Sequence, residues 1–193
     1  MTEFLSSDYW SKRYSDESTG WDLGQISPPV KAYVDSLQDH SLTILIPGCG
    51  YGHEGLYLFN KGFKDVHLLD FSMEPMKHIQ QLQPDFPASH LHVEDFFEHV
   101  GSYDLIIEQT LFCAIDPSQR AHYVEKIHSL LKVGGKLVGV LFDRPFDGGP
   151  PFGGSRTEYI ELFSSFFQKI KMETCMNSVE PRMGTEVFIE IVK

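Results

Sequence analysis

A glycine-rich turn at residues 43–55 is the feature that most constrains the fold of this chain. A β-branched and leucine-rich run ends at Pro47, and Gly48, Gly50 and Gly52 follow before a helical apolar pattern begins. Glycine allows the backbone to reverse sharply and to approach a ligand that a Cβ would hold away. The following helix offers unpaired N–H groups and the positive end of its dipole, which favour a carboxylate or phosphate. The pattern predicts a strand, a turn and a helix that bind a nucleotide-like ligand.

An acidic residue follows the second apolar run of the chain. Asp70 ends residues 66–70, and an acid about 20 residues beyond such glycines binds a ribose in α/β nucleotide folds. Gly50, Gly52 and Gly55 also fit the dinucleotide fingerprint. Because NAD and S-adenosylmethionine (SAM) both contain an adenosine ribose, these residues alone leave both cofactors open.

Length, charge and cysteine content limit the class of protein. A chain of 193 residues is most simply one domain, residues 1–193, and is too short for a two-domain dehydrogenase. The formal net charge of −11 argues against nucleic-acid and membrane partners. Cys49, Cys113 and Cys175 are too scattered for a disulfide framework. With no signal peptide or membrane-length apolar run, we expect a cytoplasmic protein that is a monomer or a weak dimer.

The order of periodic segments predicts an α/β fold. Apolar patterns predict strands at residues 43–46, 66–69, 91–93, 103–109, 136–142, 169–172 and 186–192. Caps and glycines place helices at residues 28–38, 53–61, 72–82, 117–131 and 155–166. Five strand–helix units followed by a hairpin predict a mainly parallel seven-stranded sheet with helices on both faces and an antiparallel closing strand. This is the Rossmann-like architecture of class I methyltransferases.

Two groups of aromatic residues have alternative interpretations. Trp10, Tyr14 and Trp21 lie at helical spacings of four and seven, and they either anchor an N-terminal segment to the core or form a lid over a ligand. Asp95 and Phe96 follow the third strand. They either contact an adenine or are an ordinary loop acid beside a core ring.

A long loop follows the fifth strand. Residues 143–154 contain four glycines and three prolines, and a loop of this length is more often functional than structural. Asp143 and Asp147 lie in it and are candidate general bases. Ser155 and Glu158 then form a predicted capping box at the start of the next helix.

Several of these segments resemble one known family. They are Trp10 and Trp21 with Asp22, the run Ile-Pro-Gly-Cys-Gly at residues 46–50, the run Phe-Cys-Ala-Ile-Asp-Pro at 112–117 with Arg120, and Gly-Gly-Pro-Pro-Phe at 148–152. Together they resemble the thiopurine and thiol/halide methyltransferase family over nearly the whole chain. The resemblance implies transfer of the SAM methyl group to a small soft nucleophile, most plausibly a thiol or related sulfur or selenium compound, with S-adenosylhomocysteine (SAH) as product.

The resemblance also assigns residues to the site. It implies that residues 1–27 form a lid, that Gly48 and its neighbours lie beside the methionine part of SAM, and that Asp70 binds the ribose. The implied cofactor-binding residues are Trp10, Tyr14, Trp21, Gly48, Cys49, Gly50, Asp70, Phe71, Asp95, Phe96 and Gln109. The candidate substrate-binding residues are Phe112, Arg120, Phe152 and Arg182.

Other functions stay open at this stage. A halide or thiocyanate methyltransferase is one. Phe152 argues against it, because thiopurine-type members resemble this chain with Phe at that position, whereas the halide branch has Tyr there. An NAD-dependent reductase and a SAM-binding protein without turnover are others; the Tyr57 and Lys61 pair lies on the first helix after the glycines, away from a nicotinamide site. The nine histidines show no helical metal pair with a third ligand, so we expect no metal.

Overall fold

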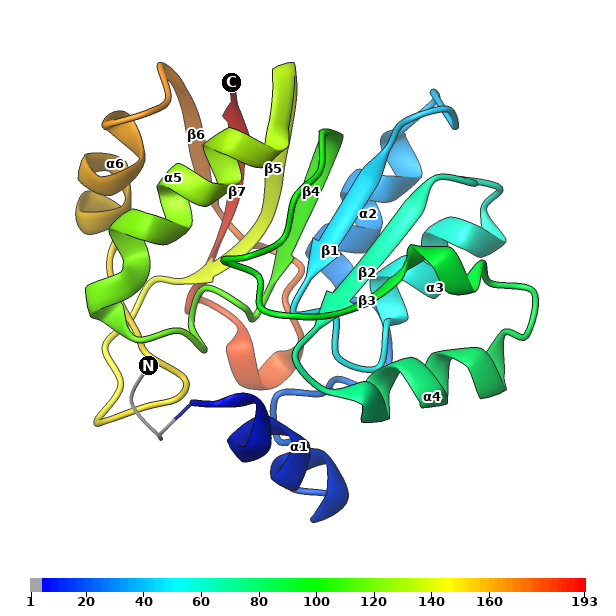
Figure 1. Cartoon of the computed structure of the whole chain (residues 1–193). Helices are drawn as coiled ribbons and strands as arrows, with labels where there is room; N and C mark the ends of the chain where they lie inside the picture. Colours follow the sequence, from blue (N-terminus) through cyan, green and yellow to red (C-terminus); the bar gives the residue numbers. More distant parts are fainter. Residues whose placement is uncertain (1–4) are drawn as a thin grey trace.

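One seven-stranded sheet organises the computed structural model, which describes residues 5–193 (Figure 1). The strand order is β3-β2-β1-β4-β5-β7-β6; β7 is antiparallel to both of its neighbours, and the other pairs are parallel. This confirms the predicted fold. The strands are β1 (Ile44–Pro47), β2 (Val66–Asp70), β3 (Leu91–Val93), β4 (Tyr103–Gln109), β5 (Leu131–Phe142), β6 (Lys169–Thr174) and β7 (Glu186–Val192).

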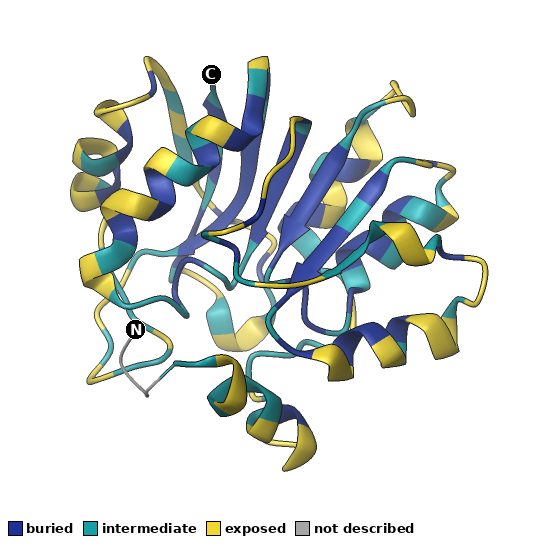
Figure 2. Cartoon of the chain, viewed as in Figure 1, coloured by how far each residue is buried: buried dark blue, intermediate teal, exposed yellow. Residues whose placement is uncertain are grey.

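Helices cover both faces of the sheet. The α-helices are α1 (Ser7–Ser15), α2 (Pro28–Ser36), α3 (His53–Asn60), α4 (Met73–Leu82), α5 (Arg120–Leu130) and α6 (Arg156–Ser164). Short 3₁₀ helices are η1 (Ala88–His90), η2 (Pro117–Gln119) and η3 (Glu180–Arg182). One apolar cluster joins the sheet to α5 and α6, and a second joins the opposite face to α2, α3 and α4. The central strands β1, β2 and β4 are therefore buried on both sides, whereas the edge strands β3 and β6 are more exposed (Figure 2).

Most predicted elements are present, with shifted ends. The helix predicted over 28–38 ends at Ser36, and β5 begins at Leu131 because that residue pairs with Tyr103 across an irregular register. Gly135 follows, where an added Cβ would lie 2.9 Å from the Tyr103 carbonyl oxygen. A glycine at this position therefore lets the backbone of β5 lie close to the start of β4.

Three segments gather at the carboxyl ends of the parallel strands: α1, the loop at 143–154 and η3 (Figure 1). We call residues 5–27 the lid segment; residues 1–4 of the predicted lid lie outside the described residues. Among residues 5–193, no helix combines the length and apolar character that crossing a membrane requires.

Candidate active site

The glycine turn after β1 places its backbone against β2. Gly50 has a φ of 52°, which favours glycine, and its N–H donates to Asp70 Oδ2 at 3.1 Å. Gly55 lies where an added Cβ would come within 2.3 Å of Leu68 Cδ2, so this glycine brings α3 onto the sheet. The turn thereby exposes Gly48 at the edge of a cavity.

Asp70 is the most highly organised carboxylate at this edge. It ends β2 and is buried, and it accepts hydrogen bonds from Gly50 N–H, from Ser72 N–H at 3.0 Å and from the Tyr14 hydroxyl at 3.3 Å. Burial raises the pKa of Asp70 above its ordinary value, while these donors favour the charged form. The Tyr14 bond is the longest of the three, so a ligand hydroxyl can share that acceptor position most easily.

The lid segment covers this carboxylate with aromatic rings. Trp21 makes edge-to-face contacts with Trp10 and Tyr14, at centroid distances of 5.4 and 5.5 Å. Helix α1 is tied to the start of α4 by Ser11 Oγ, which lies 3.0 Å from Ser72 Oγ. Aromatic pairs of this geometry contribute about 0.5–1.5 kcal/mol each beyond their burial. The segment is both packed onto the body and positioned over the cavity, which combines the two sequence interpretations.

A large cavity lies beneath the lid segment, with a volume of about 470 Å³. That size falls within the range of small-molecule sites. Its lining from the first half of the chain includes Trp10, Arg13, Tyr14, Trp21, Gly48, Asp70, Phe71, Glu94, Asp95, Phe96 and Phe97. Its lining from the second half includes Thr110, Leu111, Cys113, Asp116, Phe142, Arg144, Phe146, Pro150, Pro151 and Arg182.

The two ends of the cavity differ in charge. On one side, Asp70 ends β2, and Glu94 and Asp95 follow β3. On the other side, the guanidinium of Arg144 lies 4.6 Å from the Phe146 ring and that of Arg182 lies 5.6 Å from the Phe142 ring. These two rings contact each other at 5.0 Å. One end therefore suits polar hydroxyl and amino groups, and the other suits an anion.

Arg182 also connects distant parts of the chain. Its Nη2 donates to the Trp21 carbonyl oxygen at 2.8 Å, and its Nη1 lies 3.5 Å from Glu186 Oε1. Glu186 is buried at the start of β7. The guanidinium therefore holds the lid segment to the closing strand while facing the cavity.

Arg120, by contrast, lies off the cavity lining. Its Nη1 pairs with Glu158 Oε1 at 2.6 Å, and its Nη2 donates to the carbonyl oxygens of Phe152 and Gly153. The side chain is buried over the Phe112 ring. Glu158 is thus drawn to Arg120, although Ser155 still caps α6 through the Glu158 N–H. These bonds hold the 143–154 loop against α5 and α6, and the substrate contact of Arg120 stays a prediction.

The other predicted residues off the cavity lining have structural partners or exposed positions. Asp143 pairs with Arg156 at 2.9 Å, and Asp147 is exposed, so neither candidate base faces the cavity. Phe152 donates its N–H to the Cys113 carbonyl oxygen. Predicted residues that also do not line the cavity are Cys49, Gly50, Gln109 and Phe112; their assigned roles stay predictions.

Sequence reasoning missed two notable residues at the end of β4. Glu108 is fully buried in β4, where it accepts from the Tyr123 hydroxyl at 2.5 Å and the Phe112 N–H at 2.9 Å. Burial raises its pKa to about 7. Thr110 lines the cavity with a φ of 69°, which is unusual for a β-branched residue and typical of ligand sites. The sequence could have indicated Glu108, because it is an acid inside an otherwise apolar strand. No local pattern in the sequence indicates Thr110.

Known proteins decide between the two cofactors left open by the glycines. A family model described as thiopurine S-methyltransferase (TPMT) matches residues 5–190. The chain belongs to the thiopurine S-methyltransferase family. It is 31% identical to probable thiol methyltransferase 2 of Arabidopsis thaliana, over 94% of this chain and 83% of that protein. It is 28% identical to thiocyanate methyltransferase 1 of Brassica oleracea, over 96% and 85%.

A solved structure agrees in fold. The magnesium protoporphyrin IX methyltransferase of Synechocystis PCC 6803 with bound SAH matches with a TM-score of 0.73 at 15% identity, covering 97% of both chains. Membership in the family confirms the predicted SAM-dependent methyltransferase and decides against an NAD-dependent reductase.

The cavity lining fits SAM. Asp70 offers a carboxylate to ribose hydroxyls, and Trp10, Tyr14 and Trp21 present rings that suit a sulfonium cation. Phe96 lines the cavity while most of its ring lies in the core, and Asp95 Oδ1 accepts from the Phe97 N–H at 2.9 Å. The adenine contact of this pair remains a prediction.

Proposed function

We propose that this enzyme methylates a small sulfur nucleophile that is an anion when it reacts. SAM supplies the methyl group on a sulfonium leaving group. The observation that carries the choice of acceptor is the position of Arg144 and Arg182 on the Phe142–Phe146 pair, at the far end of the cavity from Asp70. Because the net charge of the chain is −11, local arginines are needed to attract an anion.

The chain contributes alignment and exclusion of water. The lid segment and residues Pro150 and Pro151 of the long loop close over the same cavity. Holding the reacting groups in line in a dry site supplies much of the rate enhancement for such a transfer. Relatives named for thiol and thiocyanate methylation support a soft sulfur acceptor.

No general base is assigned to this reaction. Glu94 and Asp95 of the cavity lining follow β3, away from the strand β7 that Arg182 contacts, and the two predicted bases lie off the lining. Burial raises the pKa of the Cys113 thiol to about 12, which disfavours its thiolate form near neutrality. The acceptor must therefore ionise by itself, as a thiol of pKa about 8.5 partly does near neutrality.

A methyl-transfer assay tests this function. Purified protein with labelled SAM is offered small thiols, thiocyanate, halides and thiopurines. We expect transfer to sulfur acceptors, with kcat/KM rising with pH along each acceptor's own ionisation. A profile that follows one enzyme group for all acceptors would contradict the absence of a base. Absence of transfer, together with normal SAH binding, would favour a SAM-binding protein without turnover.

The two arginines give a sharper test of the acceptor's charge. We expect Arg144→Gln to raise KM for thiocyanate or a thiolate by about 5-fold to 10-fold, the effect of about 1 kcal/mol of lost attraction, and to leave SAH affinity unchanged. Arg144→Lys should retain most activity because it retains the charge. An equal loss in both variants would point to packing on Phe146 instead of charge.

We also propose a cytoplasmic setting, a small-molecule acceptor as the main partner, no nucleic-acid or membrane partner, and a monomer or weak dimer. Three free, buried cysteines and the acidic charge support this proposal.

A further inference from the structure

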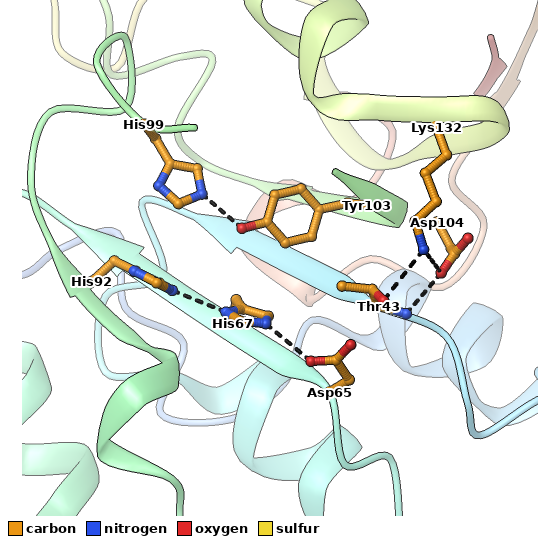
Figure 3. Close-up of polar contacts among 8 residues, drawn as sticks. All are labelled: Thr43, Asp65, His67, His92, His99, Tyr103, Asp104 and Lys132. Carbon is orange, nitrogen blue, oxygen red and sulfur yellow. Dashed lines mark hydrogen bonds and ion pairs between the residues drawn. The ribbon is translucent and has the colours of Figure 1, made fainter. Parts of the chain in front are cut away.

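Four histidines gather at the edge of the sheet, outside the proposed methyl-transfer site. The ring centroid of His67 lies 4.3 Å from that of His90 and 5.2 Å from that of His92, and His92 lies 5.1 Å from His99 (Figure 3 draws three of the four). Sequence spacing gave no sign of this cluster, because its members come from β2, η1, β3 and the segment after β3.

The parallel pairing of β2 and β3 explains how the rings meet. His92 is opposite Leu69 in the register, and His67 precedes Leu69 by two residues, so all three side chains share one face of the sheet. Leu69 belongs to the apolar cluster under α5, whereas the edge positions hold imidazoles. The segment at 94–102 then returns along this face and adds His99 (Figure 3).

Three side chains of this cluster form a potential ligand set. One ligand atom each from His92, Glu94 and His99 lies within 4.8 Å of the other two. Glu94 Oε1 is 2.6 Å from His99 Nδ1 and 3.9 Å from His92 Nδ1. Ligand atoms that lie about 2.0–2.2 Å from a tetrahedral zinc ion are about 3.3–3.6 Å from one another, and the two distances at Glu94 lie on either side of that range. The Glu94 side chain is 41% exposed and free to adjust.

The outer nitrogens of both imidazoles are already held. His99 Nε2 is 2.7 Å from the Tyr103 hydroxyl, and His92 Nε2 is 2.9 Å from His67 Nδ1. His67 Nε2 in turn lies 3.0 Å from Asp65 Oδ1, so the series of hydrogen bonds that begins at His92 ends on a carboxylate (Figure 3). Metal-bound histidines characteristically hold their other nitrogen in such bonds, which orient the ring and fix its tautomer. Both rings consequently present Nδ1 toward Glu94.

We propose that His92, Glu94 and His99 bind a divalent transition-metal ion of the zinc class. Two imidazoles and one carboxylate suit Zn²⁺, Co²⁺ or Ni²⁺ and are poor ligands for Mg²⁺ and Ca²⁺, which prefer oxygen. The hydrogen bonds at Nε2 of His92 and of His99 leave Nδ1 of each ring as the nitrogen that can bind the ion. The proposal is independent of methyl transfer, although Glu94 also lines the cavity.

Metal titration of the full chain tests the proposal. Protein stripped with EDTA is titrated with Zn²⁺ by calorimetry and with Co²⁺ by visible absorption, and bound metal is counted by elemental analysis after dialysis. We expect one bound ion per chain and its loss in His92→Gln and Glu94→Gln. We expect His67→Gln to weaken binding by about 10-fold to 100-fold, because His67 positions His92.

Matched variants separate this site from other ligands. His128→Gln, on α5 beside Phe167, removes an imidazole away from the cluster and should leave metal binding unchanged. The Glu94→Gln variant changes an exposed side chain, so we expect it to fold normally. It therefore still tests the site if the His99→Gln variant does not fold. No Zn²⁺ binding by the wild-type chain, or unchanged binding in both His92→Gln and Glu94→Gln, would overturn the proposal.

Discussion

At the scale of single residues, Asp70 links the cofactor cavity to the fold. Its carboxylate accepts hydrogen bonds from the Gly50 N–H, the Ser72 N–H and the Tyr14 hydroxyl. These bonds hold the glycine turn, the start of α4 and the lid segment together. A buried carboxylate with several donors has little freedom to move, and it is therefore preorganised for a ligand.

Replacing Asp70 tests this role. We expect Asp70→Ala to weaken SAH binding by about 1–3 kcal/mol, because buried donors of the protein and ligand lose their acceptor. Tyr14→Phe removes only one of the three bonds and should cost less, about 0.5–1.5 kcal/mol. Calorimetry on both variants measures the difference, with thermal unfolding as a check on folding. A larger loss in Tyr14→Phe than in Asp70→Ala would contradict this ranking.

Local sequence identified Asp70 because the glycine turn and the strand that mark it as a ribose ligand lie close to it in the sequence. For Trp10, Tyr14 and Trp21, spacing alone left two interpretations open; the family resemblance implied contact with the cofactor, and the three residues line the cavity. Arg120 differs. Its partners lie more than 30 residues away on the long loop and α6, so its burial and pairing depend on tertiary packing that no local pattern reports.

At the scale of elements, the lid segment depends on the closing hairpin. Arg182 on η3 donates to the Trp21 carbonyl oxygen, 161 residues away in sequence, and also pairs with Glu186. Sequence periodicity predicted both strands of the hairpin, since their apolar alternation is local. It could not predict that the connection between them holds the lid.

We expect Arg182→Gln to loosen the lid segment. Loss of the guanidinium removes the bond to Trp21 and leaves Glu186 without its cation, so amide hydrogen exchange should accelerate in residues 16–27. Exchange measured by mass spectrometry reports this directly. Arg144→Gln is the matched control, because Arg144 lines the same cavity and its hydrogen bonds in the described chain do not reach Trp21. Equal exchange in both variants would argue against the proposed tie.

At the scale of the whole molecule, a buried acid in the central sheet couples stability to pH. Glu108 lies in β4 between the two apolar clusters, and burial raises its pKa from 4.5 to about 7. The folded chain therefore holds a proton that the unfolded chain releases above about pH 4.5. The contribution of Glu108 to stability is complete at lower pH and is lost as the pH rises through about 7.

This coupling predicts a pH-dependent difference between wild type and Glu108→Gln. A pKa shift from 4.5 to about 7 corresponds to about 3 kcal/mol. We expect the free energy of unfolding of the wild type, relative to Glu108→Gln, to fall by that order between about pH 4.5 and pH 8. Urea unfolding across this range measures it. Parallel pH profiles for the two proteins would show that Glu108 does not titrate in this way.

The overall architecture was predictable because each strand and helix carries its own apolar period and the strand–helix alternation leaves few topologies. The relative position of the cavity walls was less predictable, since the antiparallel β5–β7 pairing is what brings Arg182 to the loop of Arg144 and Phe146.

The most direct test of the central claim is calorimetry with SAH and, in parallel, NADH. The account predicts tight binding of SAH, no binding of NADH, and loss of SAH affinity in Asp70→Ala. Binding of NADH without SAH would contradict it, and would mean that Gly50, Gly52 and Gly55 form a dinucleotide site despite the family to which the chain belongs.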